Sequence, residues 1–160
     1  EGAEASKPAA PEKQAANADD DKRKRLMATN TVIRTQAQSG QQTIDILKLY
    51  QFIDRYFAGD ITYKYEWYAL RRFLEKYNLL KTCDNKQFAG QMNSKEWFGS
   101  LGKRCEANEM NYYSYLNPVC PEKWIETEIQ LGSRATKRSV SKVYRTFSNL
   151  ELYKDQIIGK

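Results

Sequence analysis

Large apolar residues recur at helical spacing in two long stretches, and this pattern is what most constrains the fold of the chain. In the first stretch they are separated by four, three and four positions, at Ile46, Tyr50, Ile53 and Phe57. In the second they are separated by three, four and three positions, at Trp67, Leu70, Leu74 and Tyr77. Because residues three and four apart share one face of an α-helix, both stretches are predicted to be amphipathic helices with that face in the core. We expect Gly59 and Asn78 to end them.

Residues 1 to about 40 contrast with these helices, because they contain no aromatic residue and are rich in Ala, Pro, Glu, Lys and Asp. Such a composition buries too little apolar surface to offset the loss of chain entropy on folding. The segment is therefore predicted to be a disordered arm. Its charge changes sign abruptly between residues 19–21, all Asp, and residues 22–25, Lys-Arg-Lys-Arg. We interpret this run as a solvated linker, with a phosphate-binding arm or a nuclear address as the alternative.

Residues 84–104 are predicted to form two short helices joined by an abrupt turn. Asp84 can cap the first helix, and Gln87, three residues on, can complete a capping box. Asn93 and Ser94 are expected to form the turn. The apolar faces of the two helices consist of Phe88, Ala89 and Met92, and of Trp97, Phe98 and Leu101. Helices this short gain their stability from tertiary packing, so we expect both to pack on the longer helices.

Beyond residue 104 the pattern is more extended. Residues 104–106 and 112–115 flank a polar stretch, which predicts a β-hairpin. Apolar residues from Val140 to Leu150 are spaced for a terminal helix that reaches about Ile158. The predicted fold class is α+β and mostly α. It comprises a disordered arm over residues 1–40, a helical domain with the hairpin over residues 41–133, and a basic C-terminal helix over residues 134–160.

The net charge of +6 is distributed unevenly along the chain. Residues 71–104 hold eight basic and three acidic residues, and residues 134–160 hold seven basic and two acidic ones. Residues 105–133, between them, hold one basic and five acidic residues. Two separated basic stretches suit a polyanion such as nucleic acid, because Lys and Arg neutralise phosphates and release their counterions. The candidate phosphate contacts in the second stretch are Arg134, Lys137, Arg138 and Lys142.

The segment from Phe88 to Leu101 resembles a helix-turn-helix. It has an apolar residue followed by Ala, an apolar residue three positions later, a polar turn, and then an apolar pair with a further apolar residue. With the predicted hairpin placed as a wing, the order of elements is similar to that of the winged-helix domains of replication and mobile-element proteins. The resemblance covers about 20 of the 160 residues.

This resemblance implies that the second helix enters the major groove of duplex DNA. Carried over by position, Asn93, Ser94 and Lys95 are the candidates for contacts to bases or phosphates, and Lys103 and Arg104 are the candidates for backbone contacts. Glu96 in the same helix and the acidic residues Glu106 and Glu109 in the predicted wing oppose phosphate binding.

The absence of histidine excludes His-based catalytic triads and His-ligated zinc or haem. Cys83, Cys105 and Cys120 form no Cys-x-x-Cys pair, so no metal site is expected. An odd number of cysteines fits free thiols in a reducing, intracellular compartment, with a Cys105–Cys120 disulfide as the alternative. No run of 18 apolar residues is present, so no membrane span is expected.

Two functions remain from the sequence, and neither requires a catalytic residue or a cofactor. The first is a nucleic-acid-binding module of a replication, regulation or mobile-element protein, with duplex DNA favoured over RNA. The second is a noncatalytic structural subunit of a large complex or viral particle, with protein partners and possible contacts to RNA. The second is indicated by eleven tyrosines in the chain, because aromatic residues are enriched at protein interfaces.

Overall fold

The structure is a computed structural model that describes residues 10–35, 43–57, 64–100, 104–114, 116–117, 120–124 and 137–159. Its α-helices are α2 (Ala10–Ala28), α3 (Ile46–Tyr56), α4 (Lys64–Lys76), α5 (Asn85–Met92), α6 (Ala107–Met110), α8 (Lys137–Leu152) and α9 (Lys154–Ile157). Two 3₁₀-helices, η1 (Asn111–Tyr113) and η2 (Pro121–Lys123), and two short strands, β1 (Thr43–Ile44) and β2 (Ile158–Gly159), complete the described elements.

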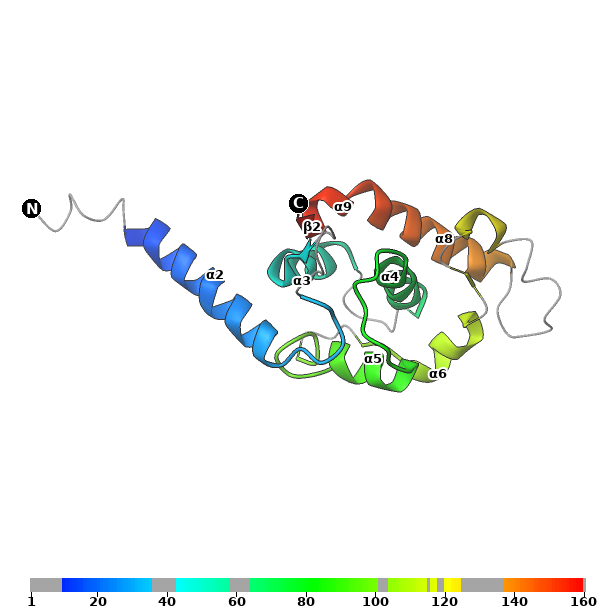
Figure 1. Cartoon of the computed structure of the whole chain (residues 1–160), viewed down its shortest axis with the longest axis horizontal. Coiled ribbons are helices and arrows are strands. Elements are labelled where there is room, and N and C mark those ends of the chain that lie inside the picture. Colours follow the sequence, from blue (N-terminus) through cyan, green and yellow to red (C-terminus); the bar gives the residue numbers. More distant parts are fainter. Residues whose placement is uncertain are drawn as a thin grey trace, which may run out of the picture.

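Helix α4 lies at the centre of the body, with α8 on one side and α5 on the other (Figure 1). Helix α4 packs against α8, while α3 packs against both α2 and α9. The side chains at the centre of these contacts include Trp67, Phe73, Phe88, Phe98 and Phe147, all of which are fully buried. The first turns of α2 extend away from this body (Figure 1).

The two predicted amphipathic helices are confirmed as α3 and α4. Helix α3 begins after Asp45, whose carboxylate accepts hydrogen bonds from the N–H groups of Leu47 and Lys48 at 3.0 and 3.3 Å. Such a cap satisfies donors that have no partner within the helix. Asn78, just past the end of α4, has a φ of 55°, which fits its predicted role as a helix stop. The other predicted stop, Gly59, lies outside the described residues.

The predicted capping box is also confirmed. The N–H of Gln87 donates to Asp84 at 2.7 Å, and the N–H of Asp84 donates to the Gln87 side chain at 2.9 Å. This reciprocal pair starts α5, whose apolar face includes the buried Phe88, Ala89 and Met92.

The predicted hairpin wing is wrong, whereas the mostly helical character is confirmed. Residues 107–113 form α6 and η1, and Met110 and Tyr113 on them are buried. These two residues are three positions apart, so a helical turn places both against the core, which a strand would not do. The extended pairing in the described residues joins β1 to β2, with Ile44 opposite Ile158, and an isolated bridge joins Ile33 to Leu80.

The predicted disordered arm is wrong for the part that ends α2 and follows it. Leu26, Val32 and Ile33 are buried in the common core. The N–H of Arg34 donates to the carbonyl of Leu79 at 2.8 Å, in the bridge beside Leu80. A segment with few apolar residues can be ordered in this way because it adds them to a core that other helices have already built. Residues 1–9 and 36–42 of the expected arm lie outside the described residues.

The predicted C-terminal helix is present as α8, although the chain turns at Tyr153 and continues as α9 and β2. The apolar residues Val140, Val143, Phe147 and Leu150 are all buried against the rest of the protein. Helix α8 therefore shares its core with the described part of residues 41–133.

Candidate nucleic-acid interface

The segment predicted to be the recognition helix has a different structure. Residues 93–100 form a series of turns, and Trp97 and Phe98 in it are fully buried. The chain is folded tightly here, since a Cβ added to Gly99 would lie 2.2 Å from the carbonyl oxygen of Asn93. Large apolar side chains directed into the core thus hold this segment against the protein, and residues 93–100 present no helix to a DNA groove.

Asn93 and Ser94, two of the predicted contact residues, are bonded within the protein. The amide of Asn93 donates to the carbonyl of Cys105 and accepts from its N–H, both at 2.8 Å. The hydroxyl of Ser94 donates to the carbonyl of Gln91 at 2.9 Å. Asn93 therefore fixes the chain at Cys105, which is a structural role. The sequence carries no local signal of it, because its partner lies twelve residues away.

The remaining predicted residues come from separate places. Lys95 is exposed in the turns after α5, and Arg104 is exposed but pairs with Glu106 at 2.7 Å. Lys103 and Arg134 lie outside the described residues. Lys137, Arg138 and Lys142 belong to α8, on the opposite side of α4 from α5 (Figure 1). Among the described residues, the two predicted groups therefore lie on different elements of the fold.

Two further arginines of the first basic stretch are largely buried on α4. Arg71 donates to the side chain of Asn85 at 3.0 Å, and Arg72 donates to the carbonyl of Leu116 at 3.0 Å. Both also pair with Glu75. These two arginines connect α4 to neighbouring segments, whereas Lys81, Lys86 and Lys95 of the same stretch are exposed.

The basic run at residues 22–25 attaches α2 to the body. Arg23 pairs with Asp45 at 3.3 Å, Arg25 pairs with Glu96 at 3.7 Å, and the Lys22 ammonium lies 4.2 Å from the centre of the Tyr50 ring. Burial disfavours the charged form of Asp45, but the hydrogen bonds from the α3 backbone and from Arg23 outweigh it and lower the pKa of this carboxyl. The run is therefore part of an ordered helix rather than a linker, and three of its four cations contact the body, while Lys24 is exposed.

Helix α8 also presents exposed basic residues, on its outer face. Lys142 and Arg145 on this face are exposed, and we call them the α8 basic face. The one acidic residue of α8 is Glu151, near its C-terminal end. Glu151 pairs with Lys76 at 2.6 Å and accepts a hydrogen bond from Tyr77, so it is engaged with α4.

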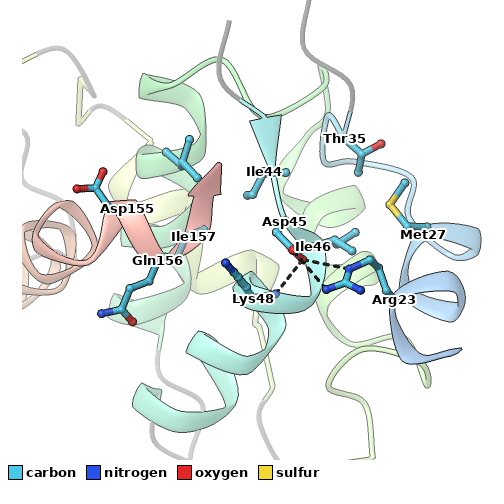
Figure 2. Close-up of a pocket in the computed structure, with 11 residues that line it drawn as sticks. Arg23, Met27, Thr35, Ile44, Asp45, Ile46, Lys48, Asp155, Gln156 and Ile157 are labelled. Carbon is cyan, nitrogen blue, oxygen red and sulfur yellow. Dashed lines mark hydrogen bonds and ion pairs between the residues drawn. The ribbon is translucent and has the colours of Figure 1, made fainter. Parts of the chain in front are cut away.

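A groove runs between α3 and α9 and consists of two adjoining cavities of about 410 and 450 Å³. Both cavities are lined by Lys48, Asp155 and Gln156, and the second also by Arg55 and Tyr56. Figure 2 shows the first cavity, with the Lys48 side chain between α3 and the α9–β2 segment and Arg23 bonded to Asp45. We call the two cavities the α3–α9 groove. Sequence reasoning missed it, because its walls come from segments about 100 residues apart.

The three cysteines, all in described segments, are free. Cys105 is buried, and burial raises the pKa of its thiol. The alternative Cys105–Cys120 disulfide is not formed. Within the described segments, no three His, Cys, Asp or Glu side chains are grouped so as to hold a metal ion.

No family model, curated protein or solved structure matches this chain. Its resemblance to winged-helix proteins therefore stays a prediction. None of the helices in the described ranges combines the length and apolar character that crossing a membrane requires.

Proposed function

We propose that the protein is a noncatalytic nucleic-acid-binding protein that contacts its ligand through the α8 basic face and the α3–α9 groove. The observation that carries this proposal is the exposure of Lys142 and Arg145 on a helix whose one acidic residue is bound to α4. Lys48 and Arg55, also exposed, add positive charge along the groove. Exposed cations on a rigid element attract phosphates and release their counterions on binding.

The proposal uses the second basic stretch of the sequence and assigns a different role to the first. In residues 71–104, the cations Arg71 and Arg72 are bound inside the fold. Charge that is already neutralised by an internal carboxylate has little left to offer a phosphate. The α8 basic face is the candidate for the polyanion contact because both of its cations are exposed to solvent.

A charge-matched pair of variants tests this proposal. Lys142→Ala with Arg145→Ala removes two positive charges from α8, and Lys95→Ala with Arg104→Ala removes two from the segment predicted to be the recognition helix. Fluorescence anisotropy with labelled single strands and duplexes over a salt series measures both. We expect the first variant to weaken binding and reduce the slope of log K against log salt by about two.

The control variant is expected to bind as the wild type does. A loss confined to the control variant would restore the segment after α5 as the nucleic-acid contact and contradict the proposal. Failure of the wild-type protein to bind any of these nucleic acids at low salt would also contradict it.

A noncatalytic subunit of a larger assembly is the second candidate, and the direction of α2 favours it. The first turns of α2 leave the body (Figure 1), and residues 17–21 of this helix are exposed. A projecting helix offers a neighbouring subunit a surface that the chain itself does not cover. A stable stoichiometric complex in a pulldown, lost when residues 10–21 are deleted, would support this role.

A further inference from the structure

Three aromatic rings are clustered where α3 ends beside α9. The Tyr56 ring stacks on that of Tyr153, with centroids 5.4 Å apart and planes at 18°, and Phe52 lies 4.6 Å from Tyr56. Phe52 is buried, whereas Tyr56 remains 44% exposed. Tyr56 is the last residue of α3, and the residues three and four positions before it, Ile53 and Phe52, are buried. We call Tyr56 and Tyr153 the tyrosine pair.

Two cations, Arg55 and Lys48, line the α3–α9 groove beside this pair. The Arg55 guanidinium carbon lies 5.4 Å from the centre of the Tyr56 ring. The side-chain amides of Gln51 and Gln156 line the same cavity. One carboxylate, that of Asp155, also faces it and reduces its positive charge.

The tyrosine pair also connects the groove to the α8 basic face. Lys142, Thr146, Asn149 and Tyr153 follow one another at intervals of four, three and four residues. Such spacing places the first three on one side of α8, leading toward Tyr153 at its end. Thr146 and Asn149 line a third cavity, of about 220 Å³, together with both tyrosines and the carboxylate of Glu66.

We propose that the tyrosine pair is a stacking site for a base of single-stranded nucleic acid, whose backbone runs from the α8 basic face to Lys48 and Arg55. The inference rests on the proposed function and names the form of nucleic acid that this surface takes. Single-strand-binding surfaces combine a cationic track for the backbone with aromatic rings on which unpaired bases stack. A duplex cannot use the pair in this way, because the faces of its bases are already stacked on one another.

The test compares Tyr56→Leu, which keeps an apolar side chain but removes the aromatic face, with Tyr56→Phe, which keeps the ring. Binding of the full chain to labelled 20-nucleotide oligo-dT, to oligo-U and to a 20-base-pair duplex is measured by anisotropy. We expect Tyr56→Leu to weaken single-strand binding at least about fivefold without changing the salt slope, and to leave duplex binding unchanged. Tyr56→Phe is expected to retain wild-type affinity. The two strand types separate DNA from RNA as the source of the base.

A second measurement needs no variant. Wild-type protein is expected to bind an abasic strand of the same length more weakly than oligo-dT, because that strand keeps the phosphates and lacks the bases. Equal affinity for the two strands, or wild-type single-strand binding by Tyr56→Leu, would overturn the stacking site. If Lys142→Ala with Arg145→Ala weakens binding in the same experiment, the proposed function stands while the stacking site falls.

Discussion

The segment after α5 and the outer face of α8 belong to sequence stretches of equal net charge, but buried side chains and polar bonds hold the first against the body, whereas the second presents exposed cations. After α5, Asn93 is bonded to the backbone of Cys105, and Glu96 pairs with Arg25 of α2. On α8, Lys142 and Arg145 are exposed along the outer face. The comparison teaches that the net charge of a stretch says little about its ligands until the internal partners of its charges are known.

The most severe test of this comparison is to shorten a buried side chain in the segment after α5. Trp97 is fully buried, and its indole N–H donates to the Thr29 hydroxyl at 3.1 Å. Trp97→Ala is expected to lower the free energy of unfolding by about 3–5 kcal/mol, because it leaves a large cavity. Urea denaturation followed by circular dichroism measures this. A change below about 1 kcal/mol would mean that the segment is only loosely attached and available to a ligand.

The variant Asn93→Ala tests the same comparison, and we expect it to lower the free energy of unfolding less than Trp97→Ala does. It removes two hydrogen bonds and leaves the N–H and carbonyl of Cys105 without these partners. We expect a loss of about 1–3 kcal/mol in the free energy of unfolding, with no change in nucleic-acid affinity while the variant is folded. Urea denaturation measures the stability of this variant, and anisotropy on the same sample measures its affinity for nucleic acid. Weakened binding with unchanged stability would show instead that Asn93 contacts the ligand.

The smallest expected effect concerns the attachment of α2 through Asp45. Its pKa is lowered in the folded protein, so its ionised form contributes stability above the ordinary carboxyl pKa, and this contribution is lost as pH falls through the lowered value. Asp45→Asn keeps a capping side chain and removes the charge that Arg23 binds. We expect the variant to be about 0.5–1 kcal/mol less stable at pH 7 and the difference to shrink below pH 4. A difference that stays constant between pH 7 and pH 3 would exclude the ion pair as its cause.

The fold could be predicted from sequence where the signals are local. The stripes of α3 and α4, the Asp84–Gln87 capping box and the stop at Asn78 depend on residues within a few positions of one another. The segments around Ile33 and Met110 were mispredicted, since their conformation depends on partners elsewhere in the chain, such as Leu80 opposite Ile33.

The candidate site was predictable only in part. Lys142 was identified from charge alone, and Arg145 belongs to the same basic helix. The tyrosine pair was missed, because Tyr56 and Tyr153 are 97 residues apart and meet only when α9 folds back onto α3. The sequence carried no local signal of the exposure of Tyr56, because this residue lies in register with the buried Phe52 and Ile53 and is exposed at the end of α3.

Asp45 joins three helices at one point, since its side chain caps α3 and binds Arg23 of α2 while its N–H donates to the carbonyl of Ile157 in α9 at 3.1 Å. Asp45 is therefore one of several points that attach α2 to the body, beside the Arg25–Glu96 ion pair and the buried Leu26. Its position also places the start of α3 next to Ile157, at the wall of the groove.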